Sequence, residues 1–277
     1  MENGIIKLMV VKCMIKRYKL VVKQDDKSNK IAHLLREKLS SVLQYDDLNP
    51  DLIISVGGDG TMLYALHQNF NLIDQTYFLG IHTGTLGFYT DYLASEVGQL
   101  VEDIKTQVYT SYKRNVLEVK VVNQDNQVQI FHALNEVRLE NPHYAQILDI
   151  YIDDELLETF RGNGVCVSTS SGSTAYNKSL GGAVIHPNLE VMQLTEIAGI
   201  QHNAYRSLGS SMVLEKHQTI TLKNKLSRPA FMGIDQMSFN LNKFTEIHIT
   251  LSKQSIRCIQ YRPLTFVNRI RRSFISE

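Results

Sequence analysis

The hydrophobic pattern of the first third of the chain predicts strands that alternate with helices. Residues 51–56 and 78–81 are short, nearly continuous apolar runs, which are typical of buried strands. Residues 28–43 carry apolar side chains at helical spacing, and Met62, Leu63, Leu66 and Phe70 predict a helix after the first run. This order indicates a parallel α/β sheet, in which ligand crevices form at the carboxyl ends of the strands.

From about Asn115 the pattern changes to alternation, which is typical of strands with one buried face. Alternating residues 117–122 and 128–132 flank a polar turn at 124–126 and predict a hairpin. Further strands are predicted at 147–152, 165–168, 219–222 and 246–251, with a helix at 191–198. We therefore predict an α/β domain over residues 1–114, completed by the segment 252–277, and a mainly β, sandwich-like domain over residues 115–251.

Composition narrows the class of protein without identifying it. With 29 Lys and Arg against 28 Asp and Glu, no overall field would draw the chain to nucleic acid or to an anionic membrane. Cys13, Cys166 and Cys258 are too widely spaced for a CxxC motif, which fits a reducing compartment. The sequence contains no run of 18 consecutive apolar residues, so it predicts no membrane-spanning helix. Residues 1–23 are apolar but interrupted by lysines, and are read as a strand or a frayed leader. Met14 leaves open that residues 1–13 are an upstream extension outside the core.

The first motif that carries chemistry is Gly57-Gly58-Asp59-Gly60-Thr61, placed between a predicted strand and a predicted helix. Glycines let backbone N–H groups approach phosphate oxygens, and a helix N-terminus adds partial positive charge. Asp59 would repel phosphates, so it implies either a Mg²⁺ ion or a substrate hydroxyl whose proton it accepts. A simple glycine turn in which the aspartate caps the helix explains the motif, taken alone, about as well.

The second motif is the run of small polar residues 162–177, in which hydroxyl side chains surround Gly172. Such donors and acceptors suit a nucleobase edge or a phosphate, although a solvated Ser/Thr loop is the alternative. The pair Gly181-Gly182 that follows favours close backbone approach.

Together with Asn135-Glu136, these two motifs resemble the NAD kinase family, in which GGDGT, an Asn-Glu pair and a [ST]-G-[ST]-TAY stretch occur in this order. The resemblance extends from about Leu20 to the C-terminus. It implies an ATP-dependent kinase that phosphorylates the adenosine ribose 2′-hydroxyl of NAD and produces NADP. Two alternatives stay open: a kinase of the same turn class that acts on a lipid or a sugar phosphate, and a non-catalytic dinucleotide-binding regulator.

The resemblance also implies roles for individual residues. Asp59 would be the catalytic base, and Gly57, Gly58 and Thr61 would form the phosphate-binding loop. The residues expected to bind NAD are Gly60, Phe88, Tyr89, Asn135, Glu136, Arg161, Asn163, Ser171, Thr174, Ala175, Tyr176, Ser179, Ala198, Tyr205 and Gln236. Some of these are expected from a neighbouring subunit of a homotetramer assembled through the second domain.

The chain departs from the family pattern at three positions. Ser170 stands where the family commonly has proline, Asn163 stands where it has a carboxylate near the nicotinamide, and Gln236 stands where some relatives have histidine. Asn163 therefore predicts weak discrimination between NAD and NADH.

The expected partners are NAD and ATP, with polyphosphate as an alternative donor, and neither nucleic acid nor a membrane. Mg²⁺ is expected as the divalent metal, held mainly by the ATP phosphates rather than by protein ligands. The expected location is the cytoplasm. The basic run 269–272 is interpreted as a solvated helix end.

Overall fold

The computed structural model describes residues 14–85, 87–226, 228–242, 244–262 and 264–275. The chain divides into two compact units. The first, here called unit 1, contains the residues up to Lys113 and those from Ile256 onward, and unit 2 is Arg114–Ser255. Of the segment 1–23, which was interpreted as a strand or a leader, residues 1–13 lie outside the described residues and Arg17–Val22 form a strand.

Unit 1 is built on a parallel sheet, as the apolar runs predict. Its strands follow the order β2 (Gln44–Tyr45), β1 (Arg17–Val22), β3 (Leu52–Gly57), β4 (Tyr77–His82), after which come β5 (Tyr92–Leu93) and the last residues of β16 (Phe244–Gln260), both parallel to β4. All residues of β3 are buried, which explains why its sequence is continuously apolar.

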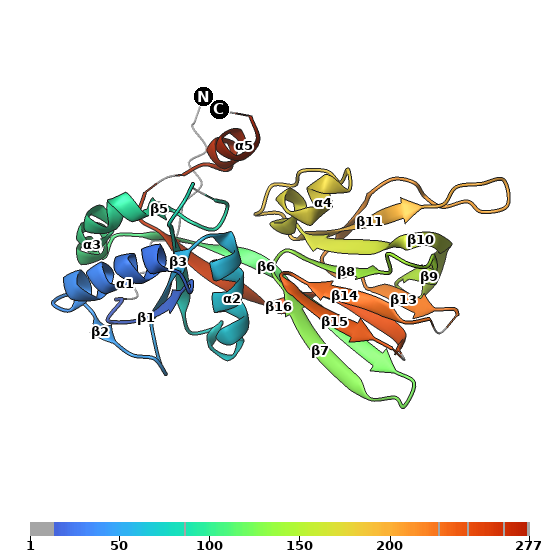
Figure 1. The fold of residues 1–277 in the computed structure, drawn as a ribbon, viewed down its shortest axis with the longest axis horizontal. Coiled ribbons are helices and arrows are strands. Elements are labelled where there is room, and N and C mark those ends of the chain that lie inside the picture. The colour runs from blue at the N-terminus through green and yellow to red at the C-terminus, as the bar shows by residue number, and fades with distance from the viewer. Residues whose placement is uncertain (1–13, 86, 227, 243, 263, 276–277) are drawn as a thin grey trace, which may run out of the picture. The chain divides into compact units, whose positions relative to one another are not determined.

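Helices cover both faces of this sheet. Figure 1 shows α1 (Asp26–Leu39) and α3 (Val97–Thr106) on one face and α2 (Asp59–Gln68) on the other. The remaining helical segments of unit 1 are the short turns Phe70–Leu72 and Ala94–Glu96 and the helix α5 (Phe266–Phe274). The core between helices and sheet contains Leu35, Leu52, Ile54 and Leu100, all fully buried.

The first helix differs from its predicted bounds of 28–43. It begins earlier because Asp25 is its N-cap and accepts a hydrogen bond from the backbone N–H of Ser28 at 2.7 Å. It ends at Leu39, so Val42 and Leu43 lie beyond it. Leu43 is nevertheless buried in the core, which is why it continued the helical spacing of apolar residues.

Unit 2 consists mainly of antiparallel strands. Seven of these strands lie side by side in one sheet, in the order β15 (Met237–Leu241), β14 (Ala230–Ile234), β8 (Glu136–Glu140), β10 (Glu155–Thr169), β9 (Gln146–Ile152), β13 (Ile220–Asn224) and the first part of β16. β11 (Val191–Gly199) pairs with both β10 and β12 (Met212–Glu215). Two short helical turns, Gly172–Thr174 and α4 (Tyr176–Ser179), follow β10.

The predicted hairpin after Asn115 is confirmed. β6 (Thr110–Asn123) pairs antiparallel with β7 (Val128–Ala133), and Asn126 in the connecting turn has a positive φ of 58°. Apolar side chains that alternate along β6, namely Leu117, Val119 and Val121, enter the core of unit 2. Alternation thus identified this element because only one of its faces is buried.

The predicted helix at 191–198 is wrong. Val191–Gly199 is the strand β11, whose residues pair with β10 on one side and partly with β12 on the other. Residues 192–195 are all buried, so both faces of this part of the strand are covered and no two-residue alternation distinguishes it from a short helix. Gly181-Gly182 therefore precedes irregular chain and then a strand, rather than a helix.

The interpretation of residues 269–272 as a solvated helix end is also wrong in part. They belong to α5, and Arg271 and Arg272 are exposed, but the Arg269 side chain is buried. No helix in the described part of the chain is long and apolar enough to cross a membrane.

Candidate functional site

The glycine-rich loop joins β3 to α2 in unit 1. Gly57 is the last residue of β3, Gly58 is the N-cap of α2, and the Gly58 backbone N–H donates to Oγ1 of Thr61 at 3.3 Å. A Cβ on Gly57 would lie 2.1 Å from that hydroxyl, whereas a Cβ on Gly60 would have no neighbour within 4 Å. Gly57 is therefore required for packing, and Gly60 leaves space at the helix N-terminus, where anions are favoured.

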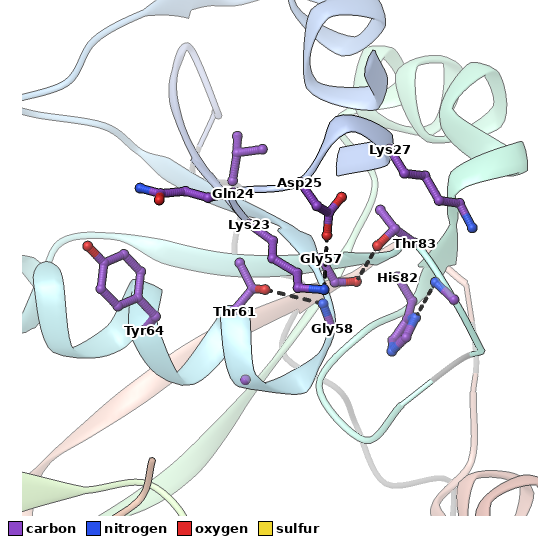
Figure 2. Close-up of a pocket in the computed structure, with 13 residues that line it drawn as sticks. Lys23, Gln24, Asp25, Lys27, Gly57, Gly58, Thr61, Tyr64, His82 and Thr83 are labelled. Atoms are coloured by element: carbon purple, nitrogen blue, oxygen red, sulfur yellow. Dashed lines mark hydrogen bonds and ion pairs between the residues drawn. The ribbon is translucent and has the colours of Figure 1, made fainter. Parts of the chain in front are cut away.

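A cavity of about 840 Å³ opens beside this loop, entirely within unit 1 (Figure 2). It is lined by Val22, Lys23, Gln24, Asp25, Lys27, Gly57, Gly58, Gly60, Thr61, Tyr64, His82, Thr83 and Gly84. These residues come from the carboxyl ends of β1, β3 and β4, from the start of α1 and from the first two turns of α2. The position agrees with the general rule for ligand crevices in parallel sheets.

The cavity carries more positive than negative side chains. Lys23 and Lys27 line it together with one carboxylate, Asp25, whose Oδ2 lies 2.9 Å from Nζ of Lys23. The backbone N–H of Ser28 and the Lys23 ammonium group lower the pKa of Asp25 to about 2. Figure 2 shows the Lys23 side chain extending toward Gly58. This arrangement suits a ligand with several negative charges.

His82 forms one wall of the cavity. Its Nδ1 accepts a hydrogen bond from the backbone N–H of Gly84 at 2.8 Å, so a neutral ring carries its proton on Nε2. A Cβ on Gly58 would lie 3.2 Å from that Nε2, which places the ring against the glycine loop. Burial lowers the pKa of His82 despite the nearby Asp59 charge. The neutral ring can therefore donate a hydrogen bond to an anion in the cavity.

The Asp59 carboxylate is held by the segment after β4. Oδ2 accepts from the backbone N–H of Phe88 at 2.7 Å, and Oδ1 accepts from that of Tyr89 at 2.9 Å. Gly87 packs so closely that a Cβ there would lie 2.3 Å from Oδ1. Phe88 and Tyr89, both expected from the family resemblance to bind NAD, thus lie beside Asp59, and their backbones fix the orientation of its carboxylate.

In unit 2, Asn135 and Glu136 are held at the start of β8 by a residue a hundred positions away. The Asp235 carboxylate accepts from the backbone N–H groups of Leu134 at 3.0 Å, Asn135 at 2.7 Å and Glu136 at 3.3 Å. Asp235 is itself buried and has a positive φ of 50° in the turn between β14 and β15. This carboxylate fixes the backbone of the Asn-Glu pair.

Glu136 lies in an unusual environment. The residue is 4% exposed, and its pKa is raised to about 8, chiefly by burial and then by the Asp235 charge. Its Oε2 has no hydrogen-bond partner in the described residues, and neither has the hydroxyl of Ser168, its partner across β8 and β10, or that of Ser171. Buried polar atoms without partners are uncommon, and a bound ligand could satisfy these.

The run of hydroxyl residues folds back against this pair. A Cβ on Gly172 would lie 1.9 Å from the backbone oxygen of Asn135, so only glycine fits there. Thr174 and Ala175 follow in partly exposed positions, and the Arg138 guanidinium lies 5.0 Å from the centre of the Tyr176 ring. The structure therefore brings together Asn135, Glu136, Ser171, Thr174, Ala175 and Tyr176.

The other predicted NAD-binding residues of unit 2 lie around the middle of β10. The Arg161 guanidinium stacks 4.3 Å from the centre of the Tyr205 ring, and Nδ2 of Asn163 donates to the backbone oxygen of Asn141 at 3.1 Å. Ala198, with a positive φ of 47°, is close by because Gly162 packs against its backbone oxygen. Ser179 and Gln236 are exposed. Among the described residues, no side-chain hydrogen bond joins them to the cluster around Asn135 and Glu136 or to the residues around the middle of β10.

Sequence reasoning missed several residues at these sites. Lys23 and Lys27 follow β1 as the glycine loop follows β3, so their place after an apolar run was a usable signal. His82 directly follows the predicted strand 78–81, so it carried the same signal. Tyr64 lies within the predicted helix, and nothing in its spacing marks it as a cavity residue. For Asp235 the sequence carries no signal, because its partners are remote in the chain.

A glycine-rich loop at the carboxyl edge of a parallel sheet, with a cationic cavity beside it, defines a class of proteins that bind phosphate groups at a strand-to-helix turn. Residues 4–109 match the model of the ATP-NAD kinase N-terminal domain, and residues 134–261 match that of the ATP-NAD kinase C-terminal domain. The chain belongs to the NAD kinase family. Family membership argues against the alternative, left open by the glycine loop alone, that the chain is a kinase acting on a lipid or a sugar phosphate.

Individual relatives agree with this family. NAD kinase 1 of Oceanobacillus iheyensis is 41% identical over 266 residues, covering 94% of this chain and 98% of the relative. The NAD kinase of Staphylococcus aureus is 39% identical over 263 residues, with 94% and 98% covered. The crystal structure of yeast NADH kinase complexed with NADH has the same fold, with a TM-score of 0.79 at 22% identity, covering 96% of this chain and 89% of that one. An NAD kinase from Archaeoglobus fulgidus, in complex with ATP, superposes with a TM-score of 0.71 at 24% identity, covering 93% and 97%.

Proposed function

We propose that this protein is an NAD kinase that transfers the γ-phosphoryl group of ATP to the adenosine ribose 2′-hydroxyl of NAD, producing NADP. Within the family, the observation that carries the proposal is the oriented Asp59 carboxylate, at the first residue of α2 in the glycine loop that borders the cationic cavity. Phosphoryl transfer depends on alignment and on charge neutralisation, which these parts supply.

The Asp59 carboxylate is the proposed base. Each of its oxygens accepts one backbone N–H and keeps a further lone pair for the ribose hydroxyl. The proposed NAD-binding residues are those expected from the family resemblance. Among them, the unpartnered Glu136 and Ser171 oxygens in unit 2 would hydrogen-bond the nucleoside.

The donor phosphates are proposed to lie in the unit 1 cavity. Lys23, Lys27 and the Nε2–H of His82 would contact phosphate oxygens, with Gly60 leaving space at the N-terminus of α2. No three His, Cys, Asp or Glu side chains among the described residues form a cluster that could hold a metal ion. An Mg²⁺ ion is proposed to be carried mainly by the donor phosphates, where it would neutralise their charge.

The direct test is turnover. Protein incubated with NAD, ATP and Mg²⁺ should form NADP, measured with an NADP-specific dehydrogenase, and EDTA should abolish the reaction because the clustered phosphate charge then lacks its counter-ion. NADP formation that EDTA does not reduce would exclude the metal. Tight NADP binding without any turnover would instead identify a non-catalytic regulator.

The choice of donor can be tested at Tyr64, a half-exposed aromatic residue on α2. In Figure 2 it lies at the opposite end of the cavity lining from His82, so a base stacked on it would leave the phosphates near the lysines. Stacking of a base on an aromatic ring contributes about 1–3 kcal/mol. Tyr64→Ala should therefore raise the KM for ATP about tenfold and leave the KM for NAD unchanged.

Inorganic tripolyphosphate, which has no base, provides the internal comparison as a competitive inhibitor against ATP. Its Ki should be unchanged in Tyr64→Ala and increased in Lys27→Gln. Tyr144→Ala, which removes an exposed tyrosine outside the cavity, is the matched control and should affect neither constant. An equal loss of affinity for ATP and tripolyphosphate in Tyr64→Ala would contradict base stacking.

We also propose an oligomeric state and a cellular location for the protein. We expect a homotetramer formed through unit 2, which light scattering can measure. Cys166 and Cys258 are buried thiols, and a reducing compartment such as the proposed cytoplasm would keep them reduced.

A further inference from the structure

The C-terminal helix α5 binds the segment that follows β4 through hydrogen bonds and an ion pair. Nη1 of the Arg269 guanidinium donates to the backbone oxygens of Gly87 at 3.0 Å and Thr90 at 2.9 Å, and Nη2 forms an ion pair with the Asp91 carboxylate. Arg269 is 4% exposed and Asp91 is 2% exposed. A single buried side chain thus binds residues 87–91, here called the Asp59 loop, at three points.

Two further contacts join the same parts of unit 1. The Phe274 ring lies 5.6 Å from the Phe88 ring, centre to centre. Just before α5, the Arg262 guanidinium donates to the backbone oxygen of Asp91 and pairs with the Glu96 carboxylate at 2.6 Å. The Asp59 loop is therefore fastened from the C-terminal segment and not only by its own neighbours in the chain.

The backbone that Arg269 binds, residues 87–91, also orients the Asp59 carboxylate. Phe88 and Tyr89, whose N–H groups bind the two carboxylate oxygens, stand between Gly87 and Thr90, whose carbonyl oxygens Arg269 binds. The N–H donors and the gripped carbonyls are thus consecutive in the chain. A shift of the loop must move the donors, and with them the carboxylate.

We propose that Arg269 is a positioning residue for phosphoryl transfer, which acts on Asp59 through the Asp59 loop. The planar guanidinium supplies several fixed donors to separate acceptors, and a lysine ammonium cannot reproduce this geometry. Misplacement of a reacting group by about 1 Å can cost a hundredfold in rate. The activity readout of this inference rests on the proposed function.

The test compares Arg269→Lys and Arg269→Ala with Arg271→Ala, an exposed arginine on the same helix. We expect kcat to fall about tenfold in Arg269→Lys and about a hundredfold in Arg269→Ala, with the KM values for NAD and ATP nearly unchanged. Arg271→Ala should match the wild type. A purely structural role would lower the amount of folded protein and leave kcat per folded molecule unchanged.

Amide hydrogen exchange gives a readout that does not depend on activity. The N–H groups of Phe88 and Tyr89 should exchange faster in both Arg269 variants and at the wild-type rate in Arg271→Ala. Arg269→Ala could fail to fold because it leaves the buried Asp91 charge without its arginine. In that case the double variant Arg269→Met/Asp91→Asn, which removes both charges, is used in place of Arg269→Ala.

The two proposals fail differently. Wild-type kcat together with unchanged exchange at Phe88 and Tyr89, in Arg269→Lys and in Arg269→Ala or the double variant, would overturn the positioning role. Absence of NADP formation by the wild-type protein would instead reject the proposed function, and the exchange measurement would still test the grip of Arg269 on the loop.

Discussion

Replacing Asp59 by asparagine should lower kcat for NADP formation by at least about a hundredfold, because a positioned general base contributes this much or more. Asparagine keeps the size of the side chain and removes the proton acceptor. The KM values for NAD and ATP should change far less, since the proton is taken in the transition state. The measurement is steady-state kinetics at saturating NAD and ATP.

The structure adds a second effect to this substitution. Both Asp59 oxygens accept a backbone N–H, so in Asp59→Asn the amide NH₂ must face one of these donors. The loss of one such hydrogen bond should lower the free energy of unfolding by about 1–2 kcal/mol. Asp125→Asn, the same chemical change in the exposed turn after β6, is the control and should keep both kcat and stability. A kcat for Asp59→Asn within a few fold of the wild-type value would remove Asp59 from the mechanism.

The parallel sheet of unit 1 was predictable because its strands β3 and β4 are buried on both faces. Residues 51–56 and 78–81 read as continuous apolar runs for this reason, and the glycine loop marks where the first run ends. The hairpin of β6 and β7 was predictable from alternation and a polar turn. In β11 the periodicity argument failed, because residues 192–195 are buried on both faces and show no alternation, and pairing with β10 decided the outcome.

The candidate site was predictable where chemistry is concentrated in a short motif. Asp59 and the glycines are consecutive, and the run 168–176 is locally unusual. The supporting contacts were not predictable, since they join residues far apart in the chain. Asp235 holds residues 134–136, and Arg269 holds residues 87–91, each through a fold that composition and spacing do not specify. Arg269 was read as solvated because a basic run at a chain end usually is.

The buried Glu136 carboxyl group should make the stability of the protein depend on pH. Its pKa is about 8 in the folded protein, against an ordinary value of 4.5. Between these values the unfolded chain loses this proton and the folded protein keeps it, so the unfolded state is favoured increasingly as pH rises. The neutral Glu136 thus contributes stability that is complete below about pH 4.5 and is lost as pH rises through about 8.

Glu136→Gln should remove this dependence, because the amide stays neutral at every pH. At about 1.4 kcal/mol per unit of pKa shift, the variant should be more stable than the wild type by up to about 5 kcal/mol at pH values above the folded-state pKa, and nearly equal in stability at acidic pH. Urea unfolding followed by circular dichroism measures the difference at each pH, and the titrations shared by both proteins cancel. Glu155→Gln, an exposed residue at the start of β10, should show no such divergence. Parallel stability curves for Glu136→Gln and the wild type across this range would mean that Glu136 ionises in the folded protein as readily as in the unfolded chain.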